Sequence, residues 1–199
     1  MNLNKKNQRV LGRFYQKIRI KLYSYLNTFS GKVTGIPILM QPLQLLGKGE
    51  IEFGSNVLFG YFPAPHYYEG LSYLQVLKPE AKISFGNNIG INNNLTIICT
   101  STSVTIGDNV FIGHDVEILD SDMHAIDPVL RKENAPYASS PIIISENVFI
   151  GNCVKILKGV QIGKNTIIAH SSVVTKSFPE NVIVGGNPAK IIKKQLVVE

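Results

Sequence analysis

Hydrophobic residues recur with a period of six along most of the chain beyond Ile83. From there to Ser177 the sequence divides into twelve units of six residues, interrupted by insertions at 101–103 and 122–141. The third position is apolar in all twelve units, and the first is apolar in ten of them. Because side chains alternate between the two faces of a strand, positions one and three point the same way. The pattern predicts a series of short strands that share one core.

The other positions of the repeat carry residues that favour bends. The fourth is often Gly, which tolerates close corners, and the sixth is often Asn or Asp, which adopt positive φ readily. Each unit therefore forms one short strand and one bend, and three units form a coil of eighteen residues, the length of 104–121, 142–159 and 160–177. We predict an all-β fold in which such coils stack into a parallel β-solenoid.

An earlier fragment, IEFGSNVLFG at 51–60, fits the same phase, so we expect the solenoid to begin before Ile51, near Ile36. The Tyr- and Pro-rich segment that follows it, at 61–80, breaks the count. It forms either an irregular coil or a loop that helps to hold a substrate. The residues with suitable side chains in that loop are Tyr61, His66, Tyr67 and Tyr68.

The charge of the chain is concentrated at its N-terminus. Residues 1–32 contain eight Lys and Arg and no acidic residue, whereas the whole chain carries a net charge of +6. Apolar residues fall near helical spacing in this segment, which predicts a short basic amphipathic helix. Such a helix could cap the solenoid or pack on a neighbouring subunit, or it could attach to an acidic membrane surface. The apolar residues are Val10, Phe14, Ile18, Leu22 and Tyr25.

The 199 residues suffice for one domain with its own core. We divide the chain into the helical segment at 1–33, the solenoid at 34–186 and a tail at 187–199. No apolar stretch reaches the roughly eighteen residues of a membrane span, and the start lacks secretory-signal features, so we expect a cytoplasmic protein, with the inner membrane face as the alternative for the basic helix. Two cysteines form no disulfide framework, and we expect no structural zinc site and no nucleic-acid partner.

The insertion at 122–141, DMHAIDPVLRKENAPYASSP, separates two intact coils. An insertion at a bend leaves the stacking of coils undisturbed and is free to carry function. It contains His124, flanked by Asp122 and Asp127. Imidazole has a pKa near neutrality and can take a proton from a hydroxyl group, so His124 is a candidate general base.

The repeat units, the motif DxHxxDPxxR and the closing segment GGNPAKIIKK at 185–194 resemble the hexapeptide-repeat acyltransferases, in particular their sugar O-acetyltransferase branch, which includes galactoside and maltose acetyltransferases. The similarity extends over about 83–194. It implies a left-handed parallel β-helix, a homotrimer, acetyl-CoA as the acetyl donor and a sugar as the acceptor. It also implies that His124 is the catalytic base.

The resemblance carries further roles to single positions. The backbone N–H of Asn152 would face the developing oxyanion, and Asn92 would bind the acceptor, although a corner asparagine also explains it. Asp122 and Asp127 would orient His124 or contact the acceptor, or they are ordinary loop carboxylates. The family commonly has Ala or Gly where this chain has His170. The residues implied to bind CoA are Gly151, His170, Thr175, Lys176, Lys190 and Lys193, and no metal is expected.

The second position of several units is apolar although it points away from the core. A soluble monomer seldom exposes a large apolar patch, and three copies that close on these faces would bury it. This supports the homotrimer from the residues alone. The outward apolar residues are Phe111, Ile143, Phe149, Ile167 and Val173.

Taken together, these features predict an acetyl-CoA-dependent O-acetyltransferase that acts on a saccharide, sugar nucleotide or lipid-linked sugar in surface-polysaccharide biosynthesis. N-acetylation of an amino sugar or an antibiotic is the alternative, and a non-catalytic scaffold is the alternative from another class. A metal-dependent hydratase is disfavoured because the four histidines do not have its spacing. Nothing in 61–80 or 122–141 identifies the acceptor.

Overall fold

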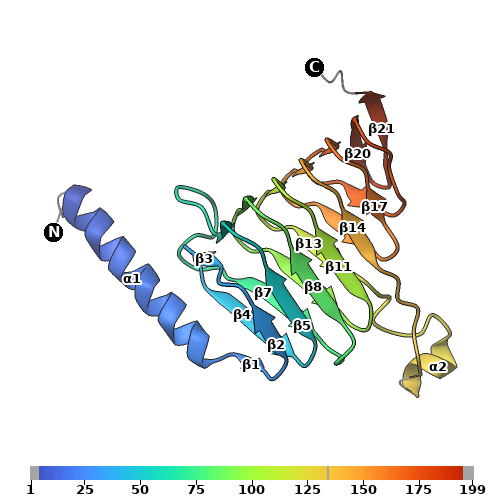
Figure 1. Ribbon diagram of the computed structural model, residues 1–199, viewed down its shortest axis with the longest axis horizontal. Coiled ribbons are helices and arrows are strands. Elements are labelled where there is room, and N and C mark those ends of the chain that lie inside the picture. Colours follow the sequence, from blue (N-terminus) through green and yellow to red (C-terminus); the bar gives the residue numbers. More distant parts are fainter. Residues whose placement is uncertain (1–4, 134, 195–199) are drawn as a thin grey trace.

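The computed structural model describes residues 5–133 and 135–194 (Figure 1). The N-terminal helix α1 (Lys5–Tyr25) is followed by strands that wind through three sheets. Sheet A contains β1 (Thr28–Phe29), β4 (Leu43–Gly47), β7 (Ser72–Val76), β10 (Thr96–Cys99), β13 (Glu117–Leu119), β16 (Lys155–Leu157) and β19 (Val173–Val174). Sheet B contains β2 (Lys32–Thr34), β5 (Glu50–Phe53), β8 (Lys82–Phe85), β11 (Ser103–Ile106), β14 (Ile142–Ile144) and β17 (Gln161–Ile162). Sheet C contains β3 (Ile38–Leu39), β6 (Val57–Phe59), β9 (Ile89–Ile91), β12 (Phe111–Ile112), β15 (Phe149–Ile150), β18 (Ile167–Ile168), β20 (Val182–Gly186) and β21 (Ala189–Lys194).

Successive coils stack in register, and each contributes one strand to each sheet. The pairs are parallel, as in β8 with β11, where Val104 and Ile106 lie beside Ile83 and Phe85. These apolar residues point inward and are buried, as positions one and three of the repeat predict. The predicted all-β fold is confirmed, and the solenoid is a left-handed parallel β-helix.

The predicted bends are also present. All six Asn or Asp residues at the sixth position of the repeat have φ between 55° and 63°. At the bends between sheets B and C their amides form a ladder, with Asn147 donating to Asn165 at 3.2 Å and Asn165 donating to Asn181 at 2.8 Å. The side chain therefore serves both the left-handed backbone and the contact between coils. The residues are Asn88, Asn94, Asn109, Asp115, Asn147 and Asn165.

The ends of the solenoid differ from the predicted boundaries. The first paired strand begins at Thr28, ahead of the boundary at 34, because β1 and β2 pair with β4 and β5 although 28–41 lacks the six-residue pattern. The segment assigned to a tail begins with an antiparallel hairpin, in which β21 pairs with β20. Residues 195–199 lie outside the described part of the chain.

Helix α1 stands beside the first coils (Figure 1). Polar side chains make contacts between the helix and these coils. The amide of Gln16 donates to the carbonyls of Met40 at 2.9 Å and Tyr67 at 2.7 Å. The guanidinium of Arg19 donates to the carbonyls of Tyr67 at 3.2 Å and Gly70 at 2.6 Å. Gln16 and Arg19 are buried, so the helix is fixed to the body by hydrogen bonds.

The apolar side of α1 does not pack on its own chain. Seven of its large apolar residues are between 49% and 75% exposed, and the helix itself forms as predicted. Among the described residues, no helix is both long and apolar enough to cross a bilayer. The seven exposed residues are Val10, Leu11, Phe14, Tyr15, Ile18, Leu22 and Tyr25.

Two segments leave the solenoid at different corners. Residues 60–71 connect β6 in sheet C to β7 in sheet A, at a set of bends that we call the polar corner. Residues 120–141 connect β13 in sheet A to β14 in sheet B, at a set of bends that we call the loop corner. The second segment carries the helix α2 (Pro128–Lys132) and projects away from the coils (Figure 1).

The outward apolar residues lie on more than one face. Phe111, Phe149 and Ile167 are neighbours in sheet C, but Ile143 belongs to sheet B and Val173 to sheet A. Three of the five therefore form one patch across adjacent coils, and the other two lie apart because the second positions of successive units point to different sides of the prism. Sheet C keeps an exposed apolar strip, in which Phe111 is 58% and Phe149 is 49% exposed.

Candidate functional site

A buried carboxylate organises the base of the segment 120–141. Asp120 is fully buried, and its two oxygens accept hydrogen bonds from the backbone and hydroxyl groups of Thr100 and Thr102 at 2.8–3.1 Å. Burial opposes the charge of Asp120, but the hydrogen bonds from Thr100, Thr102 and Ser101 outweigh it and lower the pKa of its carboxyl group. The insertion at 101–103 is thereby fixed against the start of the loop.

Beyond Asp120 the loop is held by two further contacts at its base and by the cap of its own helix. Ser121 pairs with Ser139 in an antiparallel bridge, and Asp122 forms an ion pair with Lys158 of the neighbouring coil. Asp127 caps α2, accepting hydrogen bonds from the N–H groups of Val129 at 2.8 Å and Leu130 at 3.1 Å. Among the described residues, neither aspartate forms a hydrogen bond with His124.

His124 is exposed on this loop. It lines a shallow cavity of about 400 Å³ together with Asp122, Ala125, Ile126 and Arg131. Thr175 and Lys176 follow β19 at the same loop corner and are also exposed. The structure therefore brings His124, Asp122, Thr175 and Lys176 to one corner of the prism.

Four further predicted site residues lie at the polar corner. Asn92 follows β9, Gly151 and Asn152 follow β15, and His170 follows β18. A side chain at Gly151 would meet the backbone nitrogen of His170 at 2.7 Å, so the close approach of two coils requires glycine there. The side-chain oxygen of Asn152 accepts a hydrogen bond from the N–H of His114 at 3.0 Å.

Asn92 and Asn152 line one groove on the outer side of sheet C. Its volume is about 420 Å³, and its walls include Tyr61, Phe111 and Phe149. His124 leaves the prism at the loop corner, so a single chain does not bring the predicted base and the predicted asparagines together. Lys190 and Lys193 lie apart from both sets, exposed on β21.

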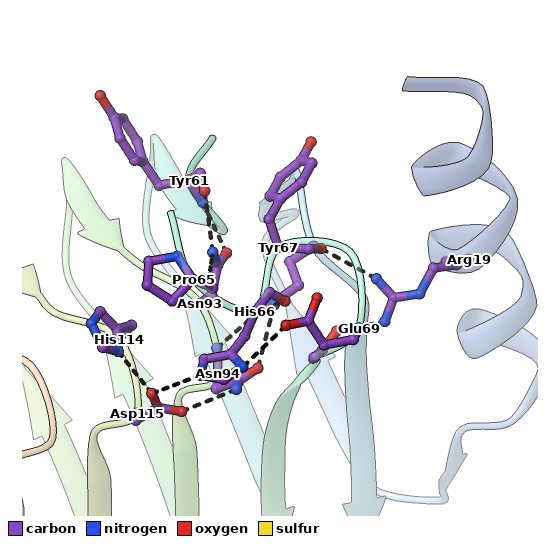
Figure 2. Close-up of polar contacts among 12 residues, drawn as sticks. Arg19, Tyr61, Pro65, His66, Tyr67, Glu69, Asn93, Asn94, His114 and Asp115 are labelled. Carbon is purple, nitrogen blue, oxygen red and sulfur yellow. Dashed lines mark hydrogen bonds and ion pairs between the residues drawn. The ribbon is translucent and has the colours of Figure 1, made fainter. Parts of the chain in front are cut away.

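The polar corner also gathers two histidines and a carboxylate that no sequence motif connects (Figure 2). Nδ1 of His114 lies 2.7 Å from a carboxylate oxygen of Asp115, and Nε2 of His66 lies 3.4 Å from the same oxygen. Asn94 donates to the other oxygen of Asp115 at 3.0 Å. Burial opposes the charge of Asp115, but the hydrogen bonds from His114 and Asn94 outweigh it, so its pKa lies below the usual value. Cys153 stands one coil further on.

Buried amides hold the segment 60–71 over this corner. The side chain of Asn93, fully buried, donates to the carbonyls of Pro65 at 2.7 Å and Tyr61 at 3.2 Å and accepts from the N–H of Tyr61. Gln41 donates to the carbonyl of His66 at 3.0 Å. The repeat places Asp115 and Cys153 at the same position of successive coils, which could have revealed their contact, but no periodic signal places His66.

Comparison with known proteins agrees with this architecture. The family model "Bacterial transferase hexapeptide (six repeats)" matches residues 141–176. A galactoside O-acetyltransferase of Lactococcus lactis is 36% identical over 154 residues, which are 77% of this chain and 68% of that protein. A putative lipopolysaccharide biosynthesis O-acetyl transferase, WbbJ of Escherichia coli, is 30% identical over 164 residues, which are 79% of this chain and 78% of that protein.

Solved structures show the same fold. The polySia-specific acetyltransferase NeuO superimposes with a TM-score of 0.61 at 25% identity, covering 87% of both chains. A galactoside acetyltransferase in complex with coenzyme A superimposes with a TM-score of 0.53 at 26% identity, covering 98% of this chain and 84% of the other. The repeat, the left-handed coils and these relatives agree, and the chain belongs to the hexapeptide-repeat acetyltransferases, a family of acyltransferases.

Proposed function

We propose that this protein transfers the acetyl group of acetyl-CoA to a hydroxyl group of a sugar in surface-polysaccharide biosynthesis. The observation that carries the proposal is the place of His124, exposed on a segment that projects from an otherwise regular solenoid. The names of the relatives support a sugar acceptor, and a similar structure is a complex with coenzyme A.

His124 acts as general base in a direct transfer. It removes the proton from the acceptor hydroxyl as the oxygen attacks the thioester carbonyl, and the carbonyl oxygen becomes an oxyanion. The backbone N–H of Asn152 donates a hydrogen bond to that oxyanion. When the intermediate collapses, the C–S bond breaks, the acetyl group stays on the sugar oxygen, and the thiolate of CoA takes the proton from the imidazolium of His124.

This mechanism requires two copies of the chain, because His124 and Asn152 lie at different corners of the prism. The loop carries exposed apolar residues at its tip, with Ile126 80% and Val129 65% exposed. The groove on sheet C is also apolar and open. We therefore assign a homotrimer in which the loop of one subunit faces the groove of the next, so that each pair of subunits completes one site.

The other roles follow from this assembly. Asn92 binds the acceptor from the groove, and Asp122 binds it from the loop. Asp127 already caps α2, so any contact with the acceptor is additional to that role. We assign six residues to the path of CoA, with Lys190 and Lys193 at its phosphate end: Gly151, His170, Thr175, Lys176, Lys190 and Lys193.

The exposed apolar side of α1 supports contact with an anionic membrane, where lipid-linked acceptors would be found. Arg13 and Lys17 are exposed on the same helix, and basic residues beside an apolar face suit an acidic lipid surface. Replacing Phe14 and Ile18 by Ser should abolish co-sedimentation with anionic vesicles and leave transfer to a small soluble sugar unchanged. Equal sedimentation of the variant and the native protein would contradict the membrane contact.

Release of CoA from acetyl-CoA in the presence of candidate acceptors tests the proposed reaction. Galactosides, nucleotide sugars and polysaccharide fragments should stimulate release, and mass spectrometry should find the acetyl group on oxygen. Amino sugars should be acetylated no faster than the matching N-acetylated sugars. Acetylation restricted to amines would establish the alternative N-acetyltransferase. Absence of transfer to every acceptor class would favour the non-catalytic scaffold.

A further inference from the structure

Four side chains with nitrogen, oxygen or sulfur donors converge at the polar corner, outside the residues assigned to acetyl transfer. His114 and Asp115 lie in the bend between β12 and β13, and Cys153 lies in the bend between β15 and β16. One donor atom of each of these three residues lies within 4.8 Å of the others. His66 reaches the same place from the segment 60–71, with its Nε2 3.4 Å from a carboxylate oxygen of Asp115 (Figure 2).

The spacing of the donor atoms of His114, Asp115 and Cys153 is close to that of ligands on one transition-metal ion. Zinc binds nitrogen, oxygen and sulfur at about 2.0–2.3 Å, so donor atoms of one ion lie within roughly 4.6 Å of each other. Imidazole, carboxylate and thiolate together favour zinc and related divalent ions over magnesium or calcium, which prefer oxygen alone.

The residues that contact the proposed ligands also support a metal site. Nδ1 of His66 lies 3.3 Å from Glu69, a carboxylate on its second ring nitrogen, which is the arrangement that orients a metal-bound histidine. Asn94 donates to one oxygen of Asp115 at 3.0 Å, and the N–H of Asn94 is in turn held by Gln41 at 2.9 Å. The other oxygen of Asp115 faces both histidines.

The backbone conformation of the bend at residue 153 does not by itself explain why a cysteine is present there. Cys153 has φ of 59°, at the position where neighbouring coils have Asn94, Asp115 and Ser171 with φ of 63°, 56° and 57°. Those three side chains can hydrogen-bond to their own bend, which a thiol does only weakly. The other cysteine, Cys99, is fully buried, and burial raises the pKa of its thiol to about 12, so it is a core residue.

Although the sequence alone predicts no metal site, we propose that His66, His114, Asp115 and Cys153 bind one divalent ion of the zinc class, which fastens the segment 60–71 to the solenoid. Binding releases the proton of the Cys153 thiol to solvent and replaces the contact between His114 and Asp115 by bonds to the ion. The ion takes no part in acetyl transfer, but the segment that it fastens includes Tyr61, which lines the groove with Asn92 and Asn152. The proposal therefore stands independently of the proposed function.

Cobalt provides the direct test, because a bound thiolate gives Co²⁺ an intense near-ultraviolet charge-transfer absorption. The full-length protein, stripped with a chelator and titrated with Co²⁺, should show this band and saturate at about one ion per chain, with zinc displacing cobalt. Cys153→Ser should lose the band. Glu69→Gln, which removes only the partner of His66, should weaken binding by about 10- to 100-fold and keep the band.

Two matched controls separate the site from nonspecific binding. Cys99→Ala removes the other thiol, and His170→Ala removes a histidine of the same corner that lies outside the cluster; both should bind cobalt like the native protein. If Cys153→Ser fails to fold by circular dichroism, His66→Ala, on the inserted segment, takes its place and should weaken binding at least tenfold.

Zinc should also protect the amides of 60–71 from hydrogen exchange and leave those of 120–141 unchanged. Absence of the charge-transfer band in the native protein, or equal binding by Cys153→Ser or by His66→Ala, overturns the metal site. A bound ion without protection of 60–71 overturns its role as a fastener.

Discussion

The two inserted segments are attached to the same solenoid in different ways. Residues 60–71 lie against the polar corner, where buried Asn93, Gln41 and Arg19 hold their backbone carbonyls. Residues 120–141 are tied at their base through Asp120, and beyond it the contacts are mostly internal, such as the cap of α2. The first segment is positioned by contacts with its own chain, whereas the second presents Ile126 and Val129 at the surface of the molecule.

Because of this difference, only the half of the proposed site that contains Asn92 and Asn152 is held in place within one chain. The groove with Asn92 and Asn152 is completed within one chain, because Tyr61 of the anchored segment forms one of its walls. His124 is carried on the projecting segment, which suits a residue that acts on a neighbouring subunit.

Replacement of His124 by Ala should have the largest effect. Loss of the base should lower kcat by about a hundredfold or more and leave the affinity for CoA nearly unchanged. Lys132→Ala, an exposed change in the same segment, should keep full activity and controls for damage to the loop. Retention of more than about a tenth of native turnover by His124→Ala would remove it from the role of base.

Replacement of Phe149 by Glu should disrupt the assembly through the exposed strip of sheet C. Light scattering should find about three times the 22.0 kDa chain mass for the native protein and one chain for the variant, with loss of activity. Ile143→Glu, on sheet B, adds the same charge to another face and should leave both unchanged. A fully active monomer would show that one chain forms a complete site.

Asp120→Asn should weaken the base of the projecting segment. Hydrogen bonds to a charged group contribute about 1.5–3 kcal/mol, so we expect a loss of that order in the free energy of unfolding at pH 7. Folding lowers the pKa of Asp120, so its contribution is complete above the unfolded pKa and disappears as the pH falls through the folded value. Denaturant unfolding of both proteins should therefore converge at low pH, and a constant difference between them would contradict the assignment.

Arg19→Ala should have the smallest effect and should loosen only the anchored segment. It leaves the partly buried carbonyl of Gly70 without its donor, which costs about 1–3 kcal/mol. Hydrogen exchange should accelerate in 60–71 and stay constant in 120–141. Lys17→Ala, an exposed change on the same helix, is the control. Equal acceleration in both segments would show that they are not independently attached.

The bends and the inward-pointing residues show what the periodic pattern could predict. The repeat phase correctly placed the inward residues, the left-handed bends and the segment that bears His124, because each coil contacts only its neighbours and a short period fixes those contacts. The same phase places Asp115 and Cys153 in adjacent coils. It does not indicate that they form a cluster with His66, because His66 lies outside the repeat.

The sequence by itself determined the solenoid, its coil length and the family, since these depend on residues close together along the chain. Only the tertiary structure decided that Arg19 holds Gly70 across 51 positions and that His66 meets Asp115. It also separated His124 from Asn152 by placing their bends at different corners. These contacts join segments with no common period, so they depend on how the insertions fold back over the coils, which local patterns do not encode.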